Sequence, residues 1–201
     1  MLDKNQQKKL VLCLKVVIHF VSSLLLSNLY YQAINDRLGA DPVEAVLHFT
    51  GIGAFNLLLL SLLISPTAKR FKLSWLLKVR RLTGLYSFVY ALCHVLSFLA
   101  FEVQFAWGLF VDEIIKRPYI TVGMCAFMIL FALAITSLSS LKRQMGQGWQ
   151  KLHNGVYLAL SLVSLHFYWS VKSEIIEPSL YVAFALYLLY LRRDKIKGWL
   201  N

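Results

Sequence analysis

Residues 82–101 read LTGLYSFVYALCHVLSFLAF, an apolar run that has no charged side chain and contains one histidine, His94. A helix of about 20 apolar residues crosses the roughly 30 Å of membrane hydrocarbon, so this stretch predicts a transmembrane helix. Similar apolar runs occupy residues 10–30, 43–65, 118–140, 152–171 and 178–191. The sequence therefore predicts an all-α integral membrane protein, a bundle of six transmembrane helices.

The composition leaves no room for a soluble domain beside these runs. Of the 201 residues, 58% are hydrophobic and 15% are charged, which excludes an ordinary water-soluble core. The first run follows several lysines but has no signal-cleavage site after it, so we expect an uncleaved helix. We find no internal repeat and no Gly-rich nucleotide loop. We therefore expect one transmembrane domain over residues 1–201 that does not bind NAD(P)H in a recognisable way, so any electrons from such a donor would have to come through another protein.

The net charge of +11 is explained by membrane topology rather than by nucleic-acid binding, because the basic residues lie between the apolar runs. With a cytoplasmic amino terminus, the segments on the inner side hold Lys4, Lys8, Lys9, Lys69, Arg70, Lys72, Lys78, Arg80, Arg81, Lys142, Arg143, Lys151, Arg192, Arg193, Lys195 and Lys197. The segments on the outer side hold Arg37, Lys116, Arg117 and Lys172. This asymmetry predicts that both termini are cytoplasmic.

Two intramembrane histidines lie at matching depth. His94 is thirteen residues past Arg81, and His166 is thirteen residues past His153, on two predicted helices that both run outward. At about 1.5 Å of rise per residue, both histidines lie in the outer half of the membrane. Two imidazoles at one depth are able to bind a haem iron from opposite sides. The alternative is that each histidine forms a hydrogen bond to a neighbouring helix, as single histidines in membrane helices often do.

A second, inner level has only one histidine. His153 lies near the inner end of the fifth predicted helix, whereas Arg80 occupies the corresponding position on the third. Arg80 is able to pair with haem propionates, with a quinone, with a flavin phosphate or with lipid headgroups. His19 and His48 have no histidine at matching depth, so we assign them structural or quinone-contacting roles and no iron.

The outer segment at residues 103–118 mixes aromatic and aliphatic residues with charged ones. This mixture is typical of a helix that lies on the membrane surface, and it also suits a docking site for a partner.

Six short motifs carry a family resemblance. They read LGADPV at 38–43, HFTG at 48–51, RRLTGL at 80–85, KRPYITVG at 116–123, WQKLHN at 149–154 and HFYWSVK at 166–172. In this order and spacing the chain resembles the MsrQ (formerly YedZ) family, the haem-bearing membrane subunits of protein-methionine-sulfoxide reductase systems. The resemblance covers most of the chain.

The resemblance implies a ferric-reductase-like transmembrane domain in a bacterial inner membrane. It also implies haem b, with one haem expected and a second in doubt because Arg80 replaces an inner histidine, and flavin mononucleotide as a further candidate cofactor. Electrons would come from the quinol pool and pass to a periplasmic molybdopterin subunit, MsrP, which carries out the sulfoxide chemistry. By matching positions, His94 and His166 are the axial iron ligands, and His153 and Arg80 are further cofactor-binding residues.

Two other functions remain open from the sequence. A quinone-dependent cytochrome b that reduces ferric or other metal ions would use the same haem. A transporter or an assembly protein would use the histidines for protons or for contacts between helices. The metal-reducing cytochrome would differ from a sulfoxide reductase subunit only in its electron acceptor. The transporter or assembly protein would be colourless.

Overall fold

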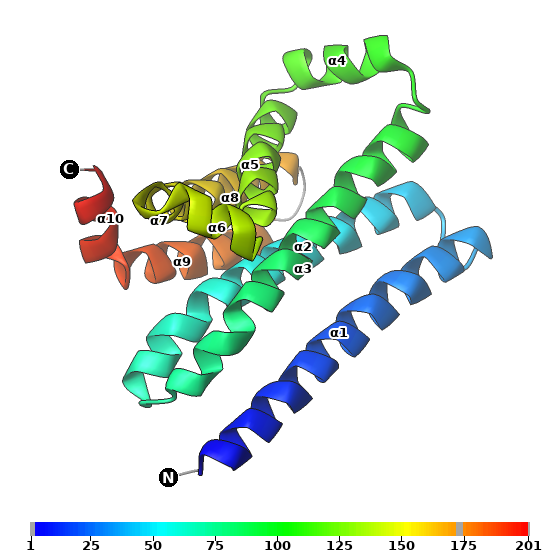
Figure 1. Ribbon diagram of the computed structural model, residues 1–201. Coiled ribbons are helices and arrows are strands. Elements are labelled where there is room, and N and C mark those ends of the chain that lie inside the picture. The colour runs from blue at the N-terminus through cyan, green and yellow to red at the C-terminus, as the bar shows by residue number, and fades with distance from the viewer. Residues whose placement is uncertain (1–2, 172–174, 201) are drawn as a thin grey trace. The chain divides into compact units, whose positions relative to one another are not determined.

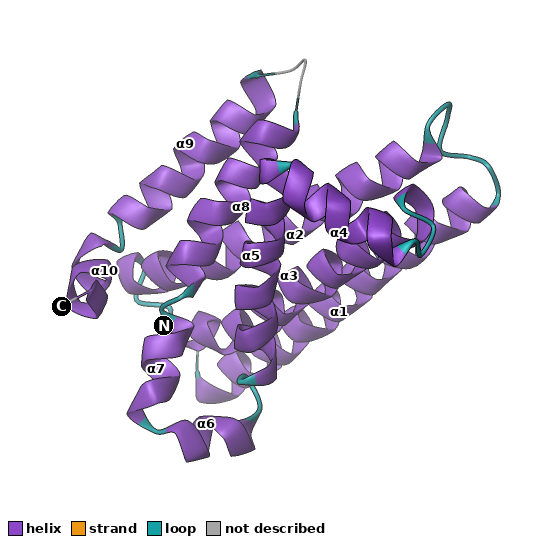
Figure 2. Cartoon of the chain, turned by 90° about the horizontal axis from the view of Figure 1, so that it is seen from above, coloured by secondary structure: helices purple, strands orange, loops and turns teal. Residues whose placement is uncertain are grey.

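The computed structural model describes residues 3–171 and 175–200, and every regular element in these residues is helical (Figure 2). The prediction of an all-α protein is therefore confirmed. The chain divides into two compact units, Met1–Phe105 (unit 1) and Ala106–Asn201 (unit 2). The single transmembrane domain over residues 1–201 stays a prediction. Lys172, assigned above to an outer segment, lies outside the described residues.

Unit 1 consists of three long helices and two short helical turns. They are α1 (Lys4–Ile34), α2 (Pro42–Arg70), the 3₁₀ turn η1 (Ser74–Leu76), α3 (Leu77–Ser97) and the π-helical turn η2 (Phe98–Glu102). Helices α2 and α3 pack side by side along most of their length, and α1 packs against α3 (Figure 1). Phe55, Leu58 and Leu62 of α2 form part of the buried core.

The ends of α2 follow from its local sequence. The Asp41 carboxylate accepts a hydrogen bond of 2.8 Å from the Glu44 amide, and Pro42 opens the first turn. At the other end, Lys69 and Arg70 lie in the last turn, where positive charge is favourable. The helix continues through Pro66, beyond the predicted limit at residue 65, and the Thr67 hydroxyl donates to the Leu63 carbonyl at 2.9 Å beside the proline.

Unit 2 begins with an amphipathic helix and continues with apolar ones. Its elements are α4 (Trp107–Lys116), α5 (Pro118–Ile135), α6 (Ser139–Met145), α7 (Gln147–His153), α8 (Val156–Ser170), α9 (Ile176–Tyr190) and α10 (Arg193–Leu200). Helix α5 packs mainly against α8, and α8 also packs against α9. Ala159 and Leu160 of α8 are completely buried. A helix is therefore present in the predicted outer segment.

Helix α5 is shorter than the predicted run at 118–140. It ends at Ile135, where the Thr136 hydroxyl donates to the Ala132 carbonyl at 2.7 Å and the Ser137 hydroxyl donates to the Leu133 carbonyl at 2.8 Å. The apolar pattern did not reveal this end because these residues are only weakly polar.

Four helical segments among the described residues are long and apolar enough to cross a membrane: Lys4–Ile34, Pro42–Arg70, Ser74–Glu102 and Pro118–Ile135. Helices α8 and α9 are shorter, at 15 residues each. The helical backbone nevertheless continues from α7 into α8, because Gly155 donates to Leu152 at 2.9 Å and Tyr157 donates to Asn154 at 3.1 Å in a tighter 3₁₀-like turn. The six-helix layout and the side of the termini stay predictions.

Candidate haem-ligand site

His94 of α3 is held by a backbone carbonyl of α2. Its Nδ1 lies 2.9 Å from the Leu47 carbonyl oxygen, and the Thr50 hydroxyl lies 3.4 Å from the same nitrogen. Because a carbonyl oxygen only accepts, the ring donates from Nδ1, and in the neutral form of the imidazole the lone pair is on Nε2. Iron-binding histidines commonly have this arrangement, in which one nitrogen is fixed by the protein and the other faces the metal.

Gly51 makes the approach of His94 to α2 possible. A methyl carbon at Gly51 would lie 3.2 Å from both Nδ1 and Cε1 of His94, tighter than ordinary van der Waals contact. Gly51 is one turn past Leu47, so the glycine opens the helix surface beside the accepting carbonyl. The His94 ring, the Leu47 carbonyl and Gly51 therefore pack together inside unit 1.

His166 of α8 makes the same kind of contact in unit 2. Its Nδ1 lies 2.7 Å from the carbonyl oxygen of Tyr119, which is in the first turn of α5. A methyl carbon at Gly123 would lie 2.7 Å from this nitrogen and 2.9 Å from Cε1. This contact is closer than the one at Gly51. The position of the His166 ring therefore depends more strictly on the absence of a side chain at residue 123 than the position of the His94 ring does on its absence at residue 51.

The two contacts repeat each other in sequence spacing. Each histidine bonds to the carbonyl of the residue 47 positions before it, and each glycine is four residues past that carbonyl. The sequence analysis found no internal repeat, and it used Gly51 and Gly123 only as the last residues of two family motifs. Each glycine precedes its histidine by the same number of residues, and this equal spacing was the one sign of the repeat in the sequence. Because the chain has many glycines, one shared spacing is not informative until the contacts are known.

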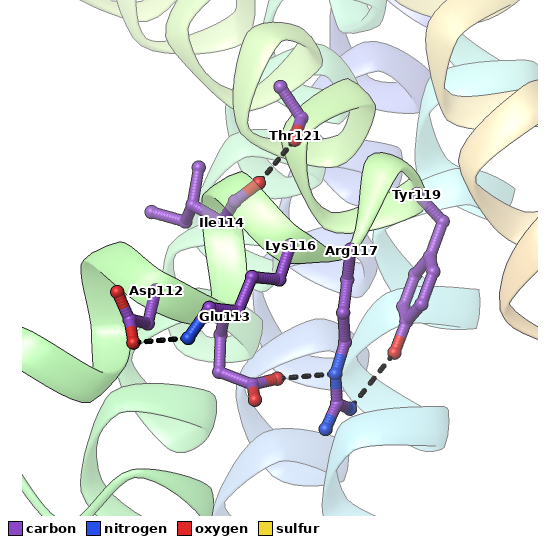
Figure 3. A network of polar contacts seen from close by, with 7 residues as sticks. All are labelled: Asp112, Glu113, Ile114, Lys116, Arg117, Tyr119 and Thr121. Atoms are coloured by element: carbon purple, nitrogen blue, oxygen red, sulfur yellow. Dashed lines mark hydrogen bonds and ion pairs between the residues drawn. The ribbon is translucent and has the colours of Figure 1, made fainter.

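The corner between α4 and α5 fixes the first turn of α5, which supplies the carbonyl for His166 (Figure 3). Arg117 Nε forms an ion pair of 2.7 Å with Glu113, and Arg117 Nη1 donates to the Tyr119 hydroxyl at 3.3 Å. The Thr121 hydroxyl donates to the Ile114 carbonyl across the same corner. This network connects α4 to the first turn of α5 in unit 2.

His153 lies in a different cluster of unit 2. Its Nε2 is 3.0 Å from the Thr136 hydroxyl, and its ring stacks on Trp149 with centroids 4.0 Å apart. Trp149 Nε1 donates to the Thr136 carbonyl at 2.9 Å, and Lys142 Nζ lies 4.4 Å from the centroid of the Trp149 ring. The cluster joins the end of α5 to α6 and α7, a setting that sequence reasoning did not foresee.

The remaining predicted residue, Arg80, is half-buried near the start of α3. It is fourteen residues before His94, about 21 Å along a helix of 1.5 Å rise. His94 belongs to unit 1 and His166 to unit 2. Within its own unit, each histidine directs Nδ1 to a backbone carbonyl.

Comparison with known proteins agrees with this chemistry. Residues 50–165 match the family described as "Ferric reductase like transmembrane component". The chain is 42% identical over 192 residues to the "Protein-methionine-sulfoxide reductase heme-binding subunit MsrQ" of Salmonella arizonae, which covers 95% of this chain and 96% of that protein. It is 41% identical, with the same coverage, to the proteins of that name from Salmonella paratyphi B and Salmonella newport.

Proposed function

Because this chain belongs to the MsrQ family and carries the ferric-reductase-like transmembrane component, we propose that it is a membrane electron-transfer subunit that holds haem b between His94 and His166. The observation that carries this assignment is the paired Nδ1–carbonyl contact, at 2.9 Å for His94 and 2.7 Å for His166. With Nδ1 committed to a carbonyl, Nε2 of each ring would be the nitrogen that binds the haem iron.

The two imidazoles determine what the haem does when it is bound. Haem would supply a one-electron carrier, and its ligation by both His94 and His166 would favour electron transfer over oxygen binding. The protein supplies ligands, orientation and a low dielectric, while the cofactor supplies the redox chemistry.

The membrane layout in this proposal has six transmembrane helices with both termini in the cytoplasm of a bacterial inner membrane. Support comes from the four long helices, from the helical backbone that continues from α7 into α8, and from the excess of basic residues in the inner segments. In this layout His94 and His166 are in the outer half of the membrane. His153 and Arg80 are at the inner level.

The electron donor in this proposal is the membrane quinol pool, with flavin mononucleotide as a candidate intermediate carrier. The acceptor is an MsrP-like periplasmic molybdopterin subunit, which repairs methionine sulfoxide in oxidised proteins. The sulfoxide reaction belongs to that partner and not to this chain. At the inner level, Arg80 suits a propionate or phosphate oxyanion, and His153 suits a flavin, a quinone or a second haem.

The test is the reduced-minus-oxidised absorption spectrum of the purified chain, with haem quantified per chain, for the wild type and for His94→Ala, His166→Ala and His153→Ala. We expect a low-spin b-type spectrum that is lost in the first two variants and retained in the third. A colourless wild type, purified from cells supplied with haem, would refute the redox function.

The electron acceptor needs a separate test. We expect reduction of protein methionine sulfoxide from a quinol only when the chain is produced together with an MsrP-like partner. Reduction of ferric chelate by the chain alone, at a comparable rate, would instead identify a metal reductase.

A further inference from the structure

Three polar side chains meet in the apolar part of unit 1. Nδ1 of His19 on α1 lies 2.8 Å from the Tyr86 hydroxyl on α3, and the Ser23 hydroxyl lies 3.1 Å from the same oxygen. The His19 and Tyr86 rings meet edge to face, with centroids 5.4 Å apart. We refer to His19, Ser23 and Tyr86 as the His19–Tyr86 cluster. The haem-ligand site does not use it.

Other hydrogen bonds between α1 and α3 show what structural contacts look like in this unit. Tyr90 donates to the Ser22 carbonyl at 2.9 Å, and both residues are buried, with 3% and 6% of their surface exposed. His19, in contrast, is exposed. A polar contact that only joins two membrane helices is best placed between them, as Tyr90 is, because an exposed polar group in hydrocarbon is costly. The exposure of His19 therefore leaves its ring accessible to a ligand from the lipid side.

The surroundings of His19 restrict the class of ligand. Val16 and Phe20, which flank it on α1, are 58% and 64% exposed. His19 is also in the middle of the predicted apolar run at residues 10–30. A ligand that reaches this position must dissolve in hydrocarbon and must also offer oxygen atoms for hydrogen bonds.

We infer that the His19–Tyr86 cluster binds the head group of a lipid-soluble quinol. The inference rests on the proposed function, which requires a membrane-dissolved electron donor. An imidazole suits both redox forms of such a ligand. When Tyr86 donates to Nδ1, the ring proton is on Nε2 and is able to donate to a quinone carbonyl. When Nδ1 donates to Tyr86, Nε2 is able to accept a quinol hydroxyl.

The position of the cluster along α3 also suits this role. Tyr86 is eight residues before His94, which is about 12 Å along a helix of 1.5 Å rise. Both residues belong to one unit and one continuous helix, so their separation is fixed. A head group at the cluster is therefore held at a constant axial distance from the proposed iron ligand.

The experiment is a calorimetric titration of the full, purified chain in detergent with decylubiquinone and, separately, with menaquinone-1. The variants are His19→Phe and Tyr86→Phe, and haem per chain is measured in each preparation. The matched control is Tyr90→Phe, which also removes a tyrosine hydroxyl that α3 donates to α1, but in the buried interface. Tyr86→Phe removes only one hydroxyl group and should preserve the packing of α1 against α3. It therefore keeps the test valid if His19→Phe disturbs that packing.

We expect at least one of the two quinones to bind the wild type, and each cluster variant to weaken that binding about tenfold, as the loss of a hydrogen bond in a desolvated site implies. The Tyr90→Phe variant should bind within twofold of the wild type, with haem content unchanged throughout. Wild-type affinity in both cluster variants, an equal loss in Tyr90→Phe, or no binding of either quinone would refute the site.

This result is separable from the proposed function. A wild type that contains haem but binds neither quinone refutes the inference and leaves the haem assignment standing. A haem-free wild type refutes the proposed function, while the same titration still reports on quinone binding.

Discussion

Replacing Gly123 by alanine should disrupt the His166 contact by sterics alone. The new methyl carbon would lie 2.7 Å from Nδ1 and 2.9 Å from Cε1 of His166, whereas ordinary carbon contacts begin near 3.4 Å. The ring must therefore recede by about 0.7 Å. A shift of this size along the Nδ1–carbonyl line stretches the 2.7 Å hydrogen bond beyond the useful limit of about 3.2 Å.

The magnitude follows from the loss of this bond. A neutral hydrogen bond contributes about 1 kcal/mol net, and a buried acceptor left without its donor costs about 1–3 kcal/mol. Loss of the partner that orients a metal-binding histidine commonly lowers metal affinity about 10–100-fold. We therefore expect Gly123→Ala to lower haem per chain strongly and to shift the reduction potential of the haem that remains. The assays are haem quantification, potentiometric titration and the low-spin electron paramagnetic resonance signal.

Three other glycines provide graded controls. Gly51→Ala should have a weaker effect, because its methyl carbon would lie 3.2 Å from His94. Gly84→Ala should keep the wild-type haem content, because the nearest atom is 4.0 Å away. Gly53→Ala introduces a clash at 2.4 Å with Tyr90 rather than with a histidine, so it should destabilise packing without changing the signal of bound haem. A Gly123→Ala protein with wild-type haem content, potential and resonance signal would refute the reasoning.

Two further substitutions separate the backbone contacts from their neighbours. Thr50→Val should leave haem per chain unchanged, because His94 Nδ1 keeps the Leu47 carbonyl at 2.9 Å and loses only a long contact of 3.4 Å; a colourless variant would contradict this. Arg117→Ala should lower stability by no more than about 1 kcal/mol, since the arginine side chain is 46% exposed, and should leave haem binding intact. Thermal unfolding followed by circular dichroism measures the stability, and a large loss of haem would show that the α4–α5 corner is essential to the site.

The sequence was a good guide to features that depend on neighbours along the chain. The run at residues 82–101 predicts a helix, and the structure has a continuous helical segment at Ser74–Glu102. The limits were less accurate, because α2 continues through Pro66 and α5 ends at Ile135. A helix end depends on local backbone geometry, such as the turn after Ile135 in which the Ser137 amide donates to the Ala134 carbonyl at 3.1 Å, and an average over apolar residues does not detect it.

The site shows the same division between local and distant information. His94 and His166 were found from their depth, because a histidine in an apolar run is costly wherever the chain folds. Their partners could not be found, since the carbonyls of Leu47 and Tyr119 are 47 residues away and every residue has a carbonyl. Gly123 is one of ten glycines, and its contact with His166 exists only once α5 and α8 pack.

By itself, then, the sequence determined that this is an all-helical membrane protein with histidines inside its apolar runs, because hydrophobicity and helical periodicity are properties of consecutive residues. Only the tertiary structure decided which ring nitrogen each histidine commits to a carbonyl, and only the tertiary structure joined His19 to Tyr86 across two helices. The physical reason is that a hydrogen bond depends on distance and direction between groups that the chain brings together from far apart.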